Sequence, residues 1–286
     1  MRHRVLLFAA GLAVVSGIET ARALLAGRAV ATPEEWQAAT SQVRANLQPE
    51  DLIVFAPRWA DPIGRLYLGD RIPVEMAARA DAARYRRIWE VSLRGAQAPE
   101  AVGSHPVSTT HHGRIRVTLY QKVPIEVAYD FTSQHGRAHA SEFPTDGRGN
   151  EVACYSEQST LHCPETRVEP RILTVDFQPR RGLEFSTSPS HTTRLEFPEA
   201  RLGKVLIIYT GASEYDTRKH LDAPIHIEVS IDGFRLSEIR HAPGNGWQLT
   251  SVDTSRWAGV RHVVRFEVAG APGGWRNLGL HAEARP

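Results

Sequence analysis

The sequence predicts an α+β protein in which a small N-terminal α/β unit precedes an antiparallel β-sandwich. Helix-like and strand-like segments alternate over residues 32–95, whereas beyond residue 112 many short segments alternate apolar and polar residues. Gly, Pro, Asn and Asp separate these later segments, which is typical of turns between strands. The 286 residues are 42% hydrophobic and 23% charged, a composition typical of a folded globular protein.

Residues 1–31 are predicted to be an export segment. Arg2 and Arg4 precede an apolar run over 5–18, and this order matches the charged and hydrophobic regions of a signal peptide. Such a segment directs the remainder of the chain out of the cytoplasm. We therefore expect an exported protein that is periplasmic or associated with the cell envelope, with secretion as an alternative.

The sequence leaves two fates open for the export segment. Ala23 and Ala31 each end a small-x-small pattern that a signal peptidase would cleave. Alternatively, a helix continued to Leu25 reaches the roughly 20 residues needed to span a bilayer. That helix would contain Glu19 and Arg22, which lie three positions apart and are able to pair on one face. The segment is thus either a cleaved signal peptide or an N-terminal membrane anchor.

The small α/β unit is assigned to residues 32–95. Thr32 is an N-cap residue followed by Pro and two acidic residues, which predicts the start of a helix. The apolar run 52–55 predicts a buried strand, 73–87 a second helix, and 88–93 a second strand. No Gly-rich phosphate-binding motif follows the first strand, so the unit is not predicted to bind a nucleotide.

A linker is predicted over 96–112, because Ala, Pro, Gly, Ser and Thr predominate there. The β-sandwich is assigned to 113–286. Asp232-Gly233 ends the clearest alternating segment and predicts a hairpin turn. The segments with strand-like patterns are 115–119, 173–177, 195–197, 205–209, 225–231, 264–268 and 278–280.

The two cysteines, Cys154 and Cys163, lie nine positions apart in a polar, turn-rich stretch. Two thiols this close fit the two arms of a hairpin, so an oxidising compartment favours a disulfide. Two separate reduced thiols are the alternative. Without a third soft ligand nearby, the pair does not predict a zinc site.

Several classes of function are disfavoured by the sequence. The net charge is +2 and no dense basic block occurs, so nucleic acid is not an expected partner. His135 and His139 are four apart, but the intervening Gly136 disfavours the helix that would make them converge on a metal. No serine-nucleophile or zinc-protease motif is present. We predict no metal, no cofactor and no identifiable catalytic residue.

Aromatic residues indicate the candidate binding site. Trp247, Trp257 and Trp275 fall close together in predicted loops, and exposed rings of this kind stack on sugars while polar neighbours bond the hydroxyls. The alternative is that Trp247 and Trp257 fill the ends of the sandwich core. The predicted ligand-binding residues are Trp247, Trp275, Tyr215, Asp216, Arg218, Asn245 and Arg276.

Residues 34–95 resemble a known family. Trp36 in an opening helix, the segment QPEDLIVFAP at 48–57 and RLYLG at 65–69 are similar to the soluble extracytoplasmic domain of polyprenol-phosphate-sugar-dependent membrane glycosyltransferases. The resemblance implies an α/β fold outside the cytoplasm. Catalysis in that family lies in an acidic loop between membrane helices, so the resemblance implies no active-site residue here.

The last third resembles jelly-roll carbohydrate-binding domains in two segments, GWQLTSVDTS at 246–255 and VVRFEV at 263–268. The resemblance implies a sandwich that binds carbohydrate. We therefore expect a non-enzymatic extracytoplasmic binding or accessory protein that recognises a glycan or an envelope protein, with the membrane contacted only through the N-terminal segment. The alternatives are an envelope carbohydrate-active hydrolase and a structural envelope component without a small ligand.

Overall fold

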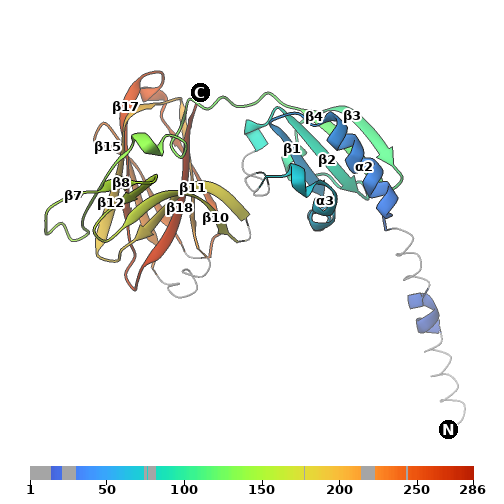
Figure 1. Ribbon diagram of the computed structural model, residues 1–286, viewed down its shortest axis with the longest axis horizontal. Helices are drawn as coiled ribbons and strands as arrows, with labels where there is room; N and C mark the ends of the chain where they lie inside the picture. Colours follow the sequence, from blue (N-terminus) through green and yellow to red (C-terminus); the bar gives the residue numbers. More distant parts are fainter. Residues whose placement is uncertain are drawn as a thin grey trace, which may run out of the picture. The chain divides into compact units, whose positions relative to one another are not determined.

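The structure, a computed structural model, describes residues 14–20, 30–73, 76, 82–176, 178–213, 223–242 and 244–286 (Figure 1). The chain divides into two compact units, a first unit within 1–72 and 85–123 and a second unit within 73–84 and 124–286. Most of the predicted export segment lies outside the described residues, and 14–20 are helical. Among the described helices, none is both long enough and apolar enough to span a membrane.

The first unit is built on a four-stranded sheet in the order β1-β2-β4-β3. β1 pairs with β2 in parallel, and the other two pairs are antiparallel. The side chains of β1 are all buried, which explains its continuous apolar sequence. The strands are β1 (Asp51–Ala56), β2 (Arg87–Leu93), β3 (His105–His112) and β4 (Ile115–Gln121).

Two helices of the first unit pack beside this sheet. Helix α2 (Pro33–Asn46) contacts β2, β3 and β4, and lies over the sheet in Figure 1. It begins with the predicted Thr32 N-cap, whose side chain accepts a hydrogen bond from the backbone of Glu35 while the Glu35 carboxylate accepts one from Thr32. Helix α3 (Asp61–Leu68) follows the short helix η1 (Arg58–Ala60) and contacts β1 and α2.

The structure corrects the predicted linker. Residues 96–112 include the short helix η4 (Pro99–Ala101) and strand β3, which pairs with β4 along its length. The segment 115–119 is a strand, as predicted, but β4 belongs to the sheet of the first unit rather than to the sandwich. β3 lacks an apolar rhythm because it is an edge strand with largely exposed side chains, held by backbone hydrogen bonds.

A buried carboxylate also ties the connection after β2 to the first unit. Glu90 on β2 is fully buried, and its carboxylate accepts hydrogen bonds from the Ala98 backbone and from Arg116 and Tyr120 on β4. These bonds satisfy a charge that would otherwise be costly to bury. The residues between β2 and β4 are therefore part of the fold of the first unit.

The second unit is an antiparallel β-sandwich, as predicted. Its described residues form an eight-stranded sheet, in the order β16-β13-β18-β11-β10-β9-β8 with β5 also on β18, and a six-stranded sheet, in the order β15-β14-β17-β12-β6-β7. The strands of the eight-stranded sheet are β5 (Tyr129–Asp130), β8 (Tyr155–Glu157), β9 (Thr160–His162), β10 (Arg167–Val175), β11 (Gln178–Thr187), β13 (Val205–Ala212), β16 (Gln248–Asp253) and β18 (Arg276–Arg285). The strands of the six-stranded sheet are β6 (His139–Pro144), β7 (Val152–Ala153), β12 (His191–Arg201), β14 (Ile225–Ile231), β15 (Phe234–His241) and β17 (Arg261–Ala269).

The core of the sandwich lies between the two sheets. The alternating residues of β12, β14 and β17 point into it, as their sequence pattern predicts. Phe131, Phe197 and Phe266 meet edge to face at centroid distances of 4.9 to 6.1 Å. The predicted turn at Asp232-Gly233 joins β14 to β15, and both of its residues have positive φ.

The predicted disulfide between Cys154 and Cys163 is present. Cys154 directly precedes β8 and Cys163 directly follows β9, so the bond closes the open end of this short hairpin. The Cys154 backbone donates to Ala140 on β6, which belongs to the other sheet. The disulfide thus holds the hairpin where the two sheets of the sandwich meet.

Candidate functional site

One face of the eight-stranded sheet points away from the sandwich core. Leu206 and Ile208 on β13 and Leu278 and Leu280 on β18 point into the core, so the residues that alternate with them point outward. Tyr209 and His281 are cross-strand partners on this outward side. We call this surface the outer face, and its members are Leu173, Val175, Arg180, Tyr209, Gly211, Gly279, His281 and Glu283.

Trp247 lies against the outer face over two glycines. Gly211 and Gly279 are cross-strand partners on β13 and β18. A Cβ at Gly211 would lie 2.8 Å from Cε3 of the indole, and one at Gly279 would lie 2.7 Å from Cη2. The indole Nε1 donates a hydrogen bond of 2.8 Å to the carbonyl of Gln178, which fixes the ring. The paired glycines therefore allow a half-buried indole to lie directly on the sheet backbone.

Arg180 on β11 places a buried positive charge beside this indole. Its Cζ lies 3.8 Å from the centroid of the Tyr209 ring and 5.5 Å from that of Trp247. Only 7% of the residue is exposed, and its Nε and Nη1 atoms have no hydrogen-bond partner among the described residues. Burial lowers the pKa of the guanidinium, the electrostatic interaction and hydrogen bond with Tyr209 act in the opposite direction, and the positive charge of Arg84 lowers it. Cation–π contacts alone offset only part of the cost of burying such a charge.

Two carboxylates near the outer face, Glu283 and Asp130, are paired with arginines. The Glu283 carboxylate is fully buried and accepts hydrogen bonds from Arg84 and Arg285. Asp130 on β5 lies 3.2 Å from Nη2 of Arg84. Two arginines thus pair with two carboxylates, while the carboxylate of Asp176 lies beside Gly246, next to Trp247. Arg180 is the positive charge that lies directly against the two aromatic rings.

His281 contributes a neutral polar group to the same face. Burial lowers the pKa of its imidazole to about 4, and the positive charges of Arg84 and Arg180 act in the same direction. Its Nδ1 lies 3.3 Å from the hydroxyl of Thr132. At neutral pH the ring is therefore uncharged, and it does not reduce the charge of Arg180.

The structure separates the residues predicted from sequence to bind a ligand. Trp247 lies on the outer face, as described above. Trp275 is 51% exposed and precedes β18, and Asn245 is also exposed. Arg276 is buried and donates to the carbonyl of Ala223, which is a structural contact. Tyr215, Asp216 and Arg218 lie outside the described residues.

Arg180, Tyr209 and His281 form the face together with Trp247, but only the tryptophan was among the predicted site residues. The sequence holds a signal for Arg180, because it stands three positions before Leu183, which points into the core, and so takes the opposite face of β11. That reasoning requires the strand and its register to be known. The polar sequence at 178–181 gives neither.

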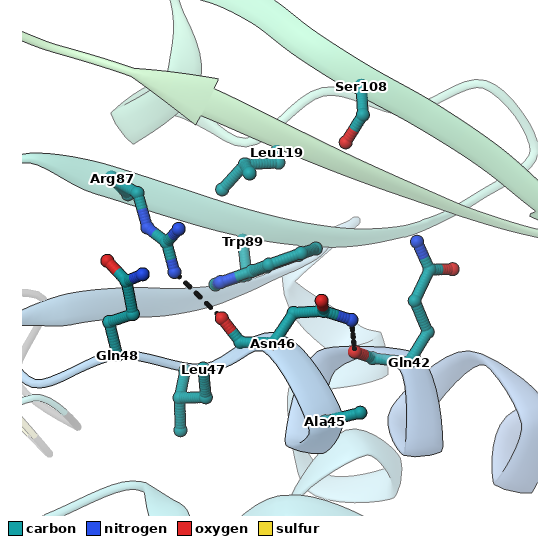
Figure 2. Close-up of a pocket in the computed structure, with 9 residues that line it drawn as sticks. All are labelled: Gln42, Ala45, Asn46, Leu47, Gln48, Arg87, Trp89, Ser108 and Leu119. Atoms are coloured by element: carbon teal, nitrogen blue, oxygen red, sulfur yellow. Dashed lines mark hydrogen bonds between the residues drawn. The ribbon is translucent and has the colours of Figure 1, made fainter.

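The first unit offers an alternative to the outer face, a hollow of about 410 Å³. Figure 2 shows Trp89 at its centre, between Gln42 and Asn46 of α2 and Leu119 of β4. The indole Nε1 donates to Asp51, which also accepts hydrogen bonds from Arg87. The full set of lining residues is Gln42, Ala45, Asn46, Leu47, Gln48, Arg87, Trp89, Ser108 and Leu119.

The polar groups of this hollow are largely bonded to one another. Arg87 donates to the Asn46 carbonyl at 2.8 Å, and the Asn46 side chain donates to the Gln42 carbonyl at 2.8 Å (Figure 2). Gln42 also bonds His112 and Thr110 of β3. A ligand would have to replace these bonds, whereas Arg180 in the second unit has unused donors. We therefore take the outer face as the candidate site.

No known family profile and no curated protein match this sequence. Solved structures are similar to part of the chain. One contains the second CBM51 module and the INT domains of Clostridium perfringens ZmpB with GlcNAc; it is 12% identical with a TM-score of 0.32, and the match covers 51% of this chain and 36% of that chain. TmCBM61 in complex with β-1,4-galactotriose is 12% identical with a TM-score of 0.32, covering 55% of this chain and 97% of the module. A cleaved adhesin domain of Lys-gingipain from Porphyromonas gingivalis is 12% identical with a TM-score of 0.31, covering 51% of this chain and 91% of that domain.

Proposed function

We propose that the second unit binds a glycan with an acidic group on its outer face, and that the protein acts outside the cytoplasm as a non-enzymatic binding or accessory protein. The observation that supports this most directly is the Arg180 guanidinium, which is buried beside Tyr209 and Trp247 with two donor atoms unbonded among the described residues.

We expect the ligand to carry an acidic group because the buried charge of Arg180 is costly without a counter-charge. An isolated ion transferred from water into a protein interior loses several kcal/mol even after relaxation. The Nε and Nη1 atoms of Arg180 are buried, so a carboxylate would reach them only by displacing a neighbouring side chain. It would then offset part of that loss with charge-assisted hydrogen bonds. A neutral sugar hydroxyl would satisfy a donor without balancing the charge.

We expect the ligand to contain a sugar ring because aromatic side chains lie beside the arginine. Trp247 and Tyr209 are both half-buried, so each is shielded on one side by the protein and partly accessible on the other. Indole and phenol rings give the apolar faces of sugars a surface to stack on, while nearby polar groups fix the orientation. An acidic sugar matches both parts of the face, the rings and the cation.

The extracytoplasmic location is supported by two features. The Cys154–Cys163 disulfide is a bond that oxidising compartments favour. The apolar run over 5–18, preceded by arginines, has the order of an export signal. Both features fit a ligand in the cell envelope or outside the cell.

A panel of matched neutral and acidic oligosaccharides tests the proposal. We expect calorimetric titration of the full chain to show binding of uronate-containing oligosaccharides and weaker binding of the corresponding hexose forms. Arg180→Gln keeps a polar side chain with an N–H donor but removes the charge and shortens the side chain, so it should weaken acidic binding about tenfold or more, as for a lost charge-assisted bond. Trp247→Ala should weaken binding of both forms.

Phe234→Ala is the matched control, because Phe234 is an exposed aromatic residue on β15 of the six-stranded sheet. It should bind both forms like the wild type. Absence of binding to every oligosaccharide of the panel would contradict glycan recognition. Binding of acidic and neutral forms that is equal, or unaffected by Arg180→Gln, would contradict the role given to the arginine.

A further inference from the structure

The first unit has an exposed apolar surface that its own fold does not use. Val30 is 61% exposed, Trp59 54%, Ile63 37% and Leu66 83%. We call these four residues the apolar patch. Three of them come from η1 and α3, at spacings of four and three residues, which places them on one side of consecutive helical turns.

The opposite side of α3 makes the contacts that the fold requires. Gly64 and Leu68 are buried, and a Cβ at Gly64 would overlap the ring of Phe55 on β1. Isolated exposed apolar side chains are common on proteins, but a helix that is apolar on both its buried and its exposed sides indicates a second contact surface. The patch is therefore available for an external partner.

The patch is continuous with a shallow pocket of about 330 Å³. Val30, Trp59 and Ile63 line it together with Trp36 and Tyr67, whose rings stack at 6.0 Å. The charged residue of the lining is Arg94, and its guanidinium lies 5.7 Å from the centroid of the Trp59 ring. A tryptophan beside an arginine, at the margin of an apolar surface, matches the chemistry of a membrane–water interface.

The apolar patch lies close in sequence to the segment that is predicted to enter the membrane. Val30 belongs to the patch, and the apolar run 5–18 ends twelve positions earlier. Twelve residues of extended chain span at most about 40 Å. If the export segment is held in the membrane, the apolar patch lies within that reach of the bilayer surface.

We propose that the apolar patch docks the first unit on the surface of a lipid bilayer, with Trp59, Ile63 and Leu66 inserted among the headgroups and the upper part of the acyl chains. Arg94 would remain at the level of the phosphates, where its charge is favoured. This docking orients the protein on the membrane in addition to any tether that the N-terminal segment supplies.

Tryptophan quenching by brominated lipid tests the docking directly. The six tryptophans are Trp36, Trp59, Trp89, Trp247, Trp257 and Trp275, so the N-terminal segment itself contributes no signal. The full chain is mixed with phosphatidylcholine–phosphatidylglycerol vesicles whose acyl chains are brominated near the headgroup. We expect part of the wild-type emission to be quenched, and that part to be lost in Trp59→Phe and strongly reduced in Leu66→Ser.

Two matched controls accompany these variants. Trp275→Phe removes an exposed tryptophan of the second unit, and Leu249→Ser removes an exposed leucine there; both should keep the wild-type quenching. Quenching that is absent in the wild type, or unchanged in Trp59→Phe, would overturn the proposal. Protection of Trp59 from aqueous acrylamide that rises with protein concentration, without lipid, would assign the patch to a second copy of the chain and also overturn it.

Discussion

Two buried histidines in the second unit are held in the uncharged form. The pKa of His241 is lowered to about 4, mainly by burial, and that of His281 to about 4 by burial and by neighbouring arginines. The Nε2 atom of His241 accepts a hydrogen bond from the Ala212 backbone, so this nitrogen must be unprotonated in the folded protein. Protonation would therefore break a bond as well as bury a charge.

These pKa values predict a loss of stability in mild acid. The unfolded histidines bind protons below their ordinary pKa of about 6.5, whereas the folded ones remain neutral down to about 4. The contribution of these histidines to the free energy of unfolding should therefore be constant above pH 7 and fall as pH decreases from 6.5 to 4, by about 3 kcal/mol for each histidine. Urea unfolding at pH 7 and pH 4.5 measures this change.

His241→Gln tests whether protonation of His241 causes part of the loss of stability in acid. The variant should be less stable than the wild type at pH 7, because the bond to Ala212 is altered, but it should lose less stability on acidification. His139→Gln, at an exposed position on β6, is the control and should retain the full pH dependence. Equal pH dependence in all three proteins would contradict a role for His241.

At the scale of single elements, the hairpin of β8 and β9 depends on its covalent closure. These strands have three residues each, and the polar sequence of β8 leaves its side chains exposed. Closing a loop of about ten residues by a disulfide stabilises a protein by roughly 2–3 kcal/mol on the chain-entropy account. We expect the Cys154→Ala/Cys163→Ala double variant to lose about this amount.

This loss of stability in the second unit can be measured by chemical unfolding of the variant and the wild type. The wild type treated with a reductant should approach the stability of the variant, while the variant should not respond. A variant as stable as the oxidised wild type would show that the hairpin is held by its backbone pairing to β10 alone.

Elements with a strong local pattern could be predicted from the sequence, and the others could not. Helix α2 has an N-cap, proline and acidic first turn, and β14 alternates without interruption, so both were predicted close to their bounds. Strand β3 was missed because an exposed edge strand needs no apolar residues, and β8 because it is short and polar. Their positions depend on partners that are distant in sequence.

The residues of the candidate site also differ in whether they could be predicted from the sequence. Trp247 could be proposed because large aromatic residues in loops are recognisable in sequence. Arg180 could not, since its importance comes from burial between Tyr209 and Trp247, and these three residues lie on or beside three different strands. Only the register of β11 and β13 against β18 brings them together.

At the scale of the whole molecule, each of the two units buries apolar side chains of its own among the described residues. The core of the sandwich is made from residues between Phe131 and Ala284, whereas β1, β2 and α2 bury their own apolar residues in the first unit. Proteins with more than one core often depart from two-state unfolding. We therefore expect calorimetry of the full chain to show two transitions.

The disulfide variant assigns these transitions. Cys154→Ala/Cys163→Ala should lower the temperature of one transition, that of the second unit, and leave the other unchanged. Glu90→Gln weakens the buried bonds of the first unit and should have the converse effect. A single transition shifted by both variants would contradict independent cores.

The position of β18 has a consequence for how the protein is made. This strand comprises residues 276–285, yet it lies between β13 and β11 in the interior of its sheet. A nascent or translocating chain that has not yet delivered these residues exposes two unpaired strand edges, which are prone to pair with other chains. The eight-stranded sheet can close only after residues 276–285 have emerged, so the edges of β13 and β11 stay open until then.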